Sequence, residues 1–316
     1  MLDEALHIDA TLDALLAQDY DGPLEVIVAD GGSTDGTLIR LEERAGVDPR
    51  LFVVDNPERL QSPGLNRAAR RASGEFLVRA DGHSTYAQDY VRNSIRTLLE
   101  TDAVAAGGPM NPVCHDGFGC AVAAAMNSRM ALPARFHHAR KREEVDTVYL
   151  GAFRRRDFLE LGGFRSFPSG TAEDADLYAR WRAAGRTVLV DPSIRSEYQP
   201  RSTARALWKQ YWRYGRGKSE MLWVNRRLPS PRPLAPALLI LGLGAFLVVA
   251  LASSVWWPLA ALAAMWLTWL AAAGLRSDAL AIGVMAAIAI MHQAYGLGLI
   301  WGLVRGPAPV RRALER

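Results

Sequence analysis

The stretch VIVADGGSTDGT, residues 26–37, ends an apolar run on Asp30 and continues with two glycines and several small polar residues. Glycine lets the backbone pass close to a ligand, and the Asp30 carboxylate could accept hydrogen bonds from a nucleobase N–H or a ribose hydroxyl. We expect Ser33 or Thr34 to cap the helix that follows. An ordinary strand-to-helix turn is the alternative interpretation, because aspartate, glycine and serine are common in turns.

A second acidic loop, RADGHS, places Asp81 at the end of a strand and His83 two residues later. A carboxylate and an imidazole this close can share one divalent cation, and such a cation neutralises the charge of a diphosphate leaving group. The sequence therefore predicts a metal site at Asp81 and His83. The alternative is a solvated turn with a surface histidine.

Three acids, Glu173, Asp174 and Asp176, crowd the start of a predicted helix in SGTAEDADLYARW, residues 169–181. Thr171 followed by Asp174 resembles a capping box, and acids favour the positive end of a helix. Capping accounts for one or two acids, but it does not require an adjacent pair. A carboxylate at the binding edge of a sheet can act as a general base, so Glu173 and Asp174 are the predicted catalytic residues.

The stretch QYWRYGRGKS, residues 210–219, interleaves aromatic and basic residues. Gln210, Arg213 and Tyr214 bring an amide, a guanidinium and a ring together at helical spacing. Such a set can hold a base or a sugar and clamp phosphate. The alternative is an amphipathic helix on the membrane surface, with its aromatic rings at the level of the lipid headgroups.

Short apolar strands alternate with helices in the first part of the chain. The predicted strands are residues 24–30, 51–56, 75–81 and 103–109, and the predicted helices are residues 34–45, 63–72 and 89–100. This alternation predicts a parallel, doubly wound α/β sheet. Ligands bind beyond the carboxyl ends of the strands in such sheets, where Asp30 and Asp81 both stand.

The C-terminal part has a different composition, with no charged residue between residues 234 and 275. Three apolar runs of about 20 residues follow one another up to residue 304, each long enough to cross a ~30 Å hydrocarbon core at ~1.5 Å per residue. Three such runs in succession predict membrane insertion rather than buried core helices. Tryptophans lie near the run ends, where aromatic belts form, and Pro258 marks the start of the second run.

The overall charge and the cysteines set weaker limits on function. The net charge is +4, and nearly all of the positive charge is arginine spread along the chain, which does not predict a nucleic-acid partner. Cys114 and Cys120 are the two cysteines, too few for a disulfide framework or a metal quartet. This cysteine usage fits a reducing cytoplasm.

The four polar stretches, in this order, resemble family 2 glycosyltransferases of the GT-A fold, most of all the membrane-anchored members that act in succinoglycan synthesis. ADGGSTDGT looks like the nucleotide-binding loop, RADGH stands at the DxD motif, AED looks like the ED or TED motif, and QYWRY looks like the QxxRW motif. The resemblance covers about residues 1–223. It implies a GT-A domain at residues 1–225 with an interfacial helix at about 203–225, a basic linker at 226–233, a transmembrane region of about three helices at 234–304, and a basic tail at 305–316.

The resemblance implies the inverting transfer of a hexose from a nucleotide-diphosphate sugar, with UDP-glucose as the expected donor. Asp30 would contact the nucleoside. Asp81, with His83 nearby, would hold Mg²⁺ or Mn²⁺ on the diphosphate. The expected acceptor is a growing polysaccharide or a polyprenyl-linked glycan, since the catalytic face sits beside the lipids of a bacterial inner membrane.

The resemblance also implies roles for the two later motifs. Asp174 would deprotonate the acceptor hydroxyl, and Glu173 would shape the acceptor site. Gln210, Arg213 and Tyr214 would close over the donor and the acceptor.

The sequence departs from the family pattern at several positions. Gly31 and Arg79 stand where aspartates are usual, and Tyr214 replaces the usual tryptophan. The opening MLDEALHI looks like the end of the motif that follows the first strand, so we expect the sheet to lack its central first strand. Two other classes stay open: a sugar-1-phosphate nucleotidylyltransferase, which shares a GT-A-like sheet, and a catalytically inactive, truncated membrane protein.

The direction of membrane insertion follows from the arginines and from the cytoplasmic origin of nucleotide sugars. The basic linker precedes the first apolar run and keeps the catalytic part in the cytoplasm. Three crossings, the interpretation favoured by run length, put the basic tail outside, although the same rule favours it inside. The alternative is two full crossings and one interfacial or re-entrant segment.

Overall fold

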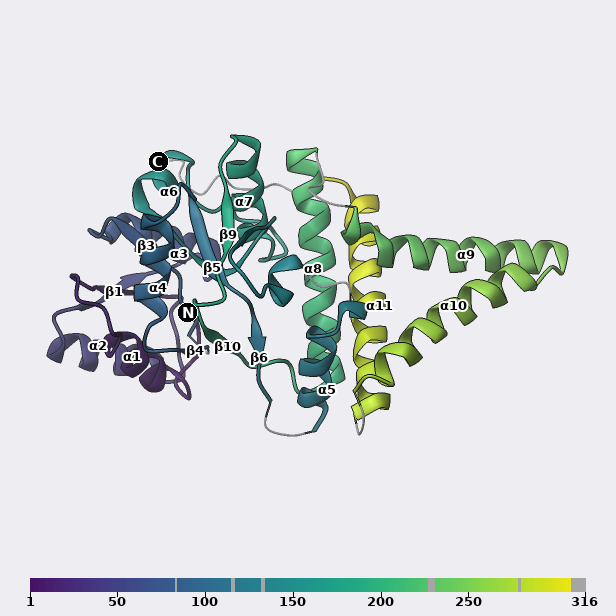
Figure 1. The fold of residues 1–316 in the computed structure, drawn as a ribbon, viewed down its shortest axis with the longest axis horizontal. Coiled ribbons are helices and arrows are strands. Elements are labelled where there is room, and N and C mark those ends of the chain that lie inside the picture. The colour runs from purple at the N-terminus through teal and green to yellow at the C-terminus, as the bar shows by residue number, and fades with distance from the viewer. Residues whose placement is uncertain (83, 115–116, 132–133, 227–230, 278–279, 308–316) are drawn as a thin grey trace.

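The predicted alternation of strands and helices is present in the structure, a computed structural model that describes residues 1–82, 84–114, 117–131, 134–226, 231–277 and 280–307. Figure 1 shows an α/β part beside a pair of long helices, from which a helical hairpin projects. The pair is α8 (Ala204–Asn225) and α11 (Ala281–Arg305), and the hairpin is α9 (Ala235–Ser253) and α10 (Trp257–Gly274). The α/β class with apolar C-terminal helices is thereby confirmed, and Pro258 does begin the second apolar helix.

A two-stranded parallel sheet carries the first acidic motif. Its strands and neighbouring helices are β1 (Val26–Asp30), β2 (Leu51–Asp55), α1 (Ile8–Leu16), α2 (Thr37–Val47) and α3 (Gln61–Arg71). On the edge of β1 away from β2, Met1 bonds through its backbone to Ala29 and Gly31. In the described part of the chain no strand pairs with this edge.

The larger sheet holds five strands in the order β3-β8-β5-β9-β7. These strands and the helices around them are β3 (Phe76–Val78), β5 (Ala105–Gly108), β7 (Glu143–Glu144), β8 (Tyr149–Arg154), β9 (Val188–Val190), α4 (Tyr90–Leu99), α6 (Arg155–Glu160) and α7 (Glu173–Ala183). The sheet is mixed rather than all-parallel, because β8 runs antiparallel between β3 and β5. Apolar periodicity reveals a strand but not its direction, so the sequence could not show this reversal.

A third, small sheet joins β4 (Thr85–Tyr86), β10 (Ser196–Tyr198) and β6 (Asn111–Pro112). Strand β10 lies in the middle, antiparallel to β4 and parallel to β6. Because β4 follows the RADGHS loop and β10 precedes α8, this sheet brings the second and fourth polar motifs to one region.

The main core fixes α7 against the five-stranded sheet. Phe153 of β8 stacks on Phe158 of α6 with their ring centroids 5.1 Å apart, and Trp181 of α7 packs against Phe153 at 5.6 Å. All three side chains are buried. Burying a side chain of this size stabilises the fold by ~1.5–3 kcal/mol or more, so the acidic start of α7 has a defined place at the sheet.

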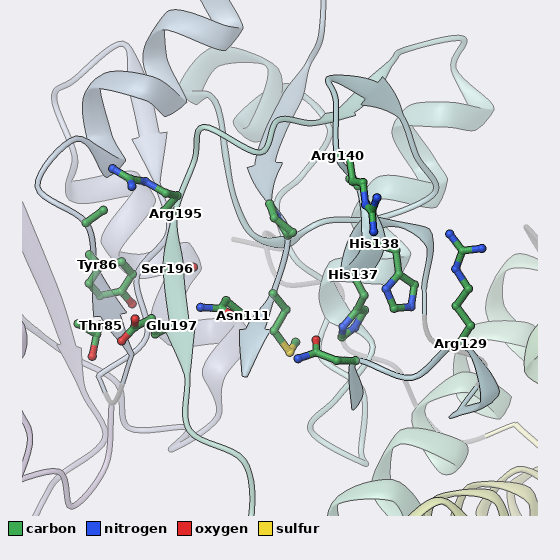
Figure 2. A pocket seen from close by; sticks show the side chains of 15 residues that line it. Thr85, Tyr86, Asn111, Arg129, His137, His138, Arg140, Arg195, Ser196 and Glu197 are labelled. Atoms are coloured by element: carbon green, nitrogen blue, oxygen red, sulfur yellow. The ribbon is translucent and has the colours of Figure 1, made fainter. Parts of the chain in front are cut away.

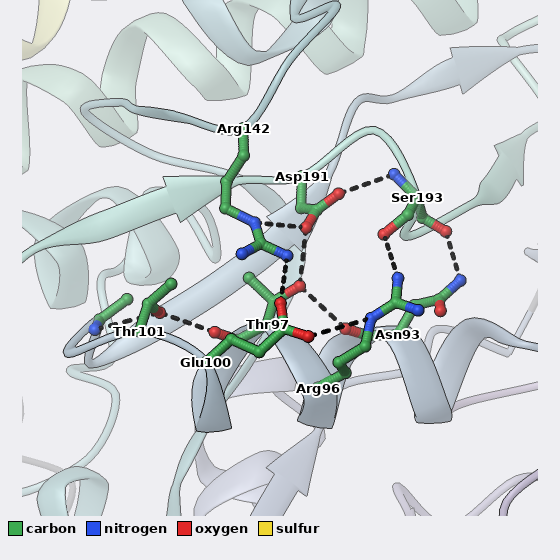
Figure 3. A network of polar contacts seen from close by, with 9 residues as sticks. Asn93, Arg96, Thr97, Glu100, Thr101, Arg142, Asp191 and Ser193 are labelled. Atoms are coloured by element: carbon green, nitrogen blue, oxygen red, sulfur yellow. Dashed lines mark hydrogen bonds and ion pairs between the residues drawn. The ribbon is translucent and has the colours of Figure 1, made fainter.

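A polar network ties α4 to the loop that leads from β9 to β10 (Figure 3). Thr97 and Arg142 each donate to Asp191 at 2.8 Å, and the Ser193 amide donates to it at 2.9 Å. Burial opposes the ionisation of Asp191, but the hydrogen bonds from Ser193, Thr97 and Arg142 outweigh it and lower the pKa to about 2. The ionised carboxylate therefore anchors this loop, and with it the start of β10.

Helices α8 and α11 lie side by side along most of their length (Figure 1). A Cβ added to Gly298 of α11 would lie 2.4 Å from the carbonyl oxygen of Trp212 in α8, so this approach requires glycine. Half of the most apolar stretch of α11 is buried (50%), whereas only 17% of the corresponding stretch is buried in each helix of the hairpin. Helix α5 (Gly117–Met126) also packs on α11. The third apolar run is therefore the packing centre of this region, and the first two are its exposed parts.

The expected cap of α2 by Ser33 or Thr34 is wrong. Gly36 precedes this helix in the left-handed conformation (φ 98°), which costs glycine little. Asp35 accepts hydrogen bonds from the amide of Thr37 at 3.0 Å and from its hydroxyl at 2.6 Å. The side chain that accepts the hydrogen bond at the start of α2 is therefore that of Asp35, one residue after Thr34.

The two cysteines are bonded to each other, which corrects the expectation from their number. Cys114 and Cys120 have Cα atoms 5.0 Å apart, close enough for a disulfide across the start of α5. Sequence spacing alone cannot show whether a loop brings two cysteines together. The cysteines therefore lend no support to a reducing compartment.

Candidate active site

The second and third acidic motifs meet at one buried guanidinium. Arg79 follows β3, and its side chain is 8% exposed. Its Nε lies 3.4 Å from Asp81 Oδ1, and its Nη2 lies 3.5 Å from Glu173 Oε1. A buried charge is tolerated only when opposite charges neutralise it. Arg79 therefore keeps the RADGHS loop and the start of α7 together.

Glu173 is the first residue of α7 and is 5% exposed. Burial and the negative charge of Asp174 raise the pKa of Glu173 to about 7, while the positive charge of Arg79 opposes this rise. The Glu173 carboxyl group therefore changes its charge near neutral pH, as groups at functional sites often do.

Asp174 is half-buried and lies in the first turn of α7, where its Oδ1 accepts from the Ala175 amide at 2.6 Å. Ala172 precedes the helix in a left-handed conformation (φ 72°), and among the described residues no side chain caps it. The capping box is therefore not formed. The Thr171 hydroxyl instead donates to the carbonyl oxygen of Arg213 at 2.9 Å.

Helix α8 holds the loop before α7 through its side chains. Arg213 donates from Nε to the Ser169 carbonyl oxygen at 3.1 Å and from Nη2 to the Gly170 carbonyl oxygen at 3.3 Å. The Ser169 amide donates to Glu220 Oε2 at 3.0 Å. The fourth polar motif thus acts directly on the third, because α8 fixes the loop that presents the acid pair.

Gln210 and Tyr214 contact a different part of the site from Arg213. The Gln210 Nε2 donates to the hydroxyl oxygens of Tyr198 at 2.8 Å and of Tyr214 at 2.9 Å. The Tyr198 ring meets the Tyr149 ring edge-on, with centroids 6.0 Å apart. The three residues of the predicted set are therefore divided between an aromatic group beside β10 and the loop before α7.

Asp30 ends β1 as predicted, but its carboxylate bonds within its own turn. Its Oδ2 accepts from the amides of Gly32 at 2.8 Å and Ser33 at 2.9 Å, and its Oδ1 accepts from the Ser33 hydroxyl at 2.6 Å. A carboxylate can accept about four hydrogen bonds, so capacity for a ligand remains. Burial lowers the pKa of the Met1 amino group, and the charges of Asp30 and Asp81 oppose this shift, which places both carboxylates near Met1.

Asp81 has a partly accessible carboxylate, 17% exposed, whose contacts are long. Gln61 Nε2 donates to its Oδ1 at 3.3 Å, and its backbone carbonyl oxygen accepts from the Tyr86 hydroxyl at 2.9 Å. His83, the second predicted metal ligand, lies outside the described residues. Within the ranges that the structure describes, no three His, Cys, Asp or Glu side chains are gathered to hold a metal.

Asp176, the third acid of its stretch, has a structural environment. It is fully buried and pairs with Arg180 at 2.8 Å and with Arg165 at 3.2 Å. Asn225 at the end of α8 also donates to it at 2.8 Å. These contacts fasten α7 to α8 behind the acid pair.

Three further residues of this region, Arg79, Tyr86 and Tyr198, are not among the predicted site residues. An arginine close to acids in the sequence, as Arg79 is to Asp81, is a visible signal for an ion pair. Nothing in the sequence marks Tyr86 or Tyr198, because the pairing of β4 with β10 brings them here.

Comparison with known proteins shows similarity to glycosyltransferases over most of the chain. Residues 2–161 match the model of the family described as Glycosyl transferase family 2. The succinoglycan biosynthesis protein ExoA of Rhizobium meliloti (strain 1021) is 32% identical over 253 residues, which cover 78% of this chain and 76% of that protein. The dolichyl N-acetyl-alpha-D-glucosaminyl phosphate 3-beta-D-2,3-diacetamido-2,3-dideoxy-beta-D-glucuronosyltransferase of Methanococcus voltae is 23% identical over 227 residues, covering 69% and 71%.

Among solved structures, the mannosyltransferase PcManGT from Pyrobaculum calidifontis, in complex with GDP-Man and Mn²⁺, has a TM-score of 0.65 to this chain at 23% identity. The match covers 95% of this chain and 85% of that one. It confirms the predicted GT-A fold. The similarity to ExoA confirms the resemblance to proteins of succinoglycan synthesis.

We expect Glu173→Gln to change how stability depends on pH. The pKa of Glu173 is raised from 4.5 to about 7 in the folded protein, so the folded state binds this proton more tightly than the unfolded state. The stability that this provides is lost as pH rises from about 4.5 to about 7. In detergent, the melting temperature of Glu173→Gln minus that of the wild type should therefore increase between about pH 5 and about pH 8.

Glu160→Gln, which changes an exposed glutamate of α6, is the matched control for this measurement. Its melting temperature should differ from that of the wild type by a constant amount over the same range. A constant difference for Glu173→Gln as well would contradict the raised pKa.

Proposed function

This chain is a member of glycosyl transferase family 2, and we propose that it is an inverting hexosyltransferase that takes its sugar from a nucleotide-diphosphate donor. UDP-glucose is the proposed donor, and a lipid-linked or growing polysaccharide is the proposed acceptor. The observation that carries this proposal is the acid pair at the start of α7, which Arg79 holds beside Asp81. Both loops lie at the edge of the sheet where α/β proteins bind their ligands.

In the proposed reaction, Asp174 removes the proton of the acceptor hydroxyl as its oxygen attacks the anomeric carbon of the donor. The bond from that carbon to the diphosphate breaks on the opposite face. The configuration therefore inverts, and the nucleoside diphosphate leaves. Glu173 shapes the acceptor side of the site next to this base.

The proposed donor contacts follow from the positions of the other motifs. Asp30 contacts the nucleoside at the end of β1. Gln210 and Tyr214 close over the donor and acceptor from the side of β10. Arg213 contributes through its hydrogen bonds to the loop before α7, which set the distance from the acid pair to the donor.

Mg²⁺ or Mn²⁺ is the proposed cofactor. Such ions are commonly held by one or two carboxylates together with substrate phosphates. Asp81 suits this role because its carboxylate is accessible and its contacts, at 3.3 Å and 3.4 Å, are weak. Asp81 would hold the ion with His83 as the second proposed ligand, and the bound ion would neutralise the charge of the departing diphosphate.

We place the protein in a bacterial inner membrane, among whose lipids its acceptor would lie, with the catalytic part in the cytoplasm. Helices α9 and α10, with 19 and 18 residues, are long enough at ~1.5 Å per residue to cross the hydrocarbon core. Helix α11 lies along α8, crosswise to the projecting hairpin (Figure 1). Since Arg213 binds α8 to the loop before α7, this packing favours two crossings with α11 at the membrane surface, and it keeps the arginines that follow α11 in the cytoplasm.

Asp174→Asn should lower turnover by ~10²–10⁴-fold while donor binding survives, because the amide keeps the size of the side chain but is not a base. The assay is release of UDP from UDP-glucose by the purified protein with a polyprenyl-linked glycan acceptor. Asp13→Asn changes an exposed aspartate of α1 and should retain normal turnover. Near-normal turnover of Asp174→Asn would refute its assignment as the base.

The same assay separates the two alternative functions. A sugar-1-phosphate nucleotidylyltransferase would instead form UDP-glucose and diphosphate from UTP and the sugar phosphate. A catalytically inactive membrane protein would release no nucleotide in either direction.

Reporter fusions test the proposed membrane arrangement. With two crossings, a reporter that is active only outside the cytoplasm should be active after Ser254, in the turn between α9 and α10, and inactive after Arg316. A cytoplasmic reporter should give the reverse pattern. Three full crossings would make both positions score as external, which would contradict the placement of α11 beside α8 at the surface.

A further inference from the structure

A cavity of about 900 Å³ lies on the small sheet formed by β4, β10 and β6 (Figure 2). Glu197 of β10 lies opposite both Thr85 and Asn111 in the strand register, so these three side chains share one face of the sheet. Tyr86, the next residue of β4, directs its hydroxyl to Asp81 instead. The cavity therefore borders the active site through Tyr86 and is a separate site.

One end of this cavity is basic. Figure 2 shows Arg129, His138 and Arg140 gathered at this end. Burial and the charges of the two guanidiniums lower the pKa of His138. In the described part of the chain neither Arg129 nor Arg140 forms an ion pair with a carboxylate, whereas nearby Arg142 binds Asp191 at 2.8 Å. Among the described residues, no ion pair therefore neutralises the positive charge of Arg129 and Arg140.

The same end holds polar atoms that lack partners. His137 Nδ1 and His138 Nε2 are buried and make no hydrogen bond within the described ranges. Burial lowers the pKa of His137 to about 4, so its imidazole is neutral at pH 7. A buried polar atom without a partner is unfavourable, so a ligand with hydrogen-bonding groups would stabilise this end.

The basic end stands at the base of the helical hairpin. The segment RMALPARFHHARKR, residues 129–142, contains no aspartate or glutamate. The Met130 carbonyl oxygen accepts from Trp269 Nε1 of α10 at 2.8 Å, and Met130 and Ala131 pack on the apolar cluster of α5, α10 and α11. Basic segments at a membrane surface attract anionic lipid.

We propose that this cavity binds a phosphate group carried by a membrane lipid, with Arg129 and Arg140 as its ligands. Guanidinium groups bind phosphate oxygens through paired N–H bonds. Thr85, Asn111 and Glu197 at the other end can bind hydroxyl groups, which suits a sugar or a glycerol attached to the phosphate. The inference rests on the proposed membrane placement, and the carrier is either a bulk anionic lipid or the polyprenyl diphosphate of the acceptor.

Lipid binding by the purified full-length protein in detergent tests this site. Native mass spectrometry would measure affinity for phosphatidylglycerol and for farnesyl diphosphate, with zwitterionic phosphatidylcholine as the reference lipid. The double variant Arg129→Gln/Arg140→Gln should lose ~10-fold or more in affinity for at least one of the two anionic probes. The matched variant Arg92→Gln/Arg156→Gln removes two exposed arginines of α4 and α6 and should bind like the wild type.

The two anionic probes separate the possible carriers. A loss confined to farnesyl diphosphate would assign the cavity to the acceptor, and a loss confined to phosphatidylglycerol would assign it to bulk lipid. The variant Arg129→Lys/Arg140→Lys, which keeps both charges without the paired N–H geometry, should lose less and guards against a fold defect in the glutamine variant. Equal binding of both probes by the wild type and the glutamine variant would overturn the proposal.

The binding measurement needs no turnover. A protein that binds the probes through these arginines but releases no UDP would refute the proposed reaction and leave this site standing. A protein that transfers sugar but binds both probes equally well without these arginines would refute this site and leave the proposed reaction standing.

Discussion

The close contact between α8 and residues 169–171 determines the geometry of the active site. Arg213 and Glu220 satisfy backbone groups of this loop, and backbone groups away from water need such partners. A Cβ on Gly217 would lie 2.3 Å from a hydroxyl oxygen of the loop, so the approach depends on glycine. Helix α8 also lies against α11 at Gly298. It therefore connects the loop of the acid pair to the apolar helices.

Charge balance explains why the acids gather where they do. Arg79 is the buried cation between Asp81 and Glu173, and without these acids its burial would be strongly unfavourable. The pKa of Glu173 is raised because burial and the adjacent charge of Asp174 outweigh the opposing effect of Arg79.

The sequence predicted the helices and strands that have strong local signals. The first three polar motifs stand where such an element ends or begins, and the fourth lies inside the long helix α8. It could not predict the reversal of β8, since apolar periodicity carries no direction, or the pairing of Cys114 with Cys120, since spacing does not reveal loop shape. The predicted site residues do not share one sheet edge: Asp81 and Glu173 meet at Arg79, but Asp30 ends a strand of a separate two-stranded sheet. Their partners were not predicted: Arg213 binds backbone carbonyl groups rather than standing free, and these contacts depend on how α8 packs in three dimensions.

A double-mutant cycle between Arg213 and Asp174 tests most directly whether α8 acts by positioning the base. If it does, Arg213→Ala should lower kcat by ~10-fold or more in the wild type and have little further effect in the Asp174→Asn background, because coupled residues give non-additive effects. If Arg213 instead acts independently, for example by binding donor phosphate, the two losses in kcat should multiply. Multiplying losses would contradict the account, and a loss in the double variant equal to that of Asp174→Asn alone would support it.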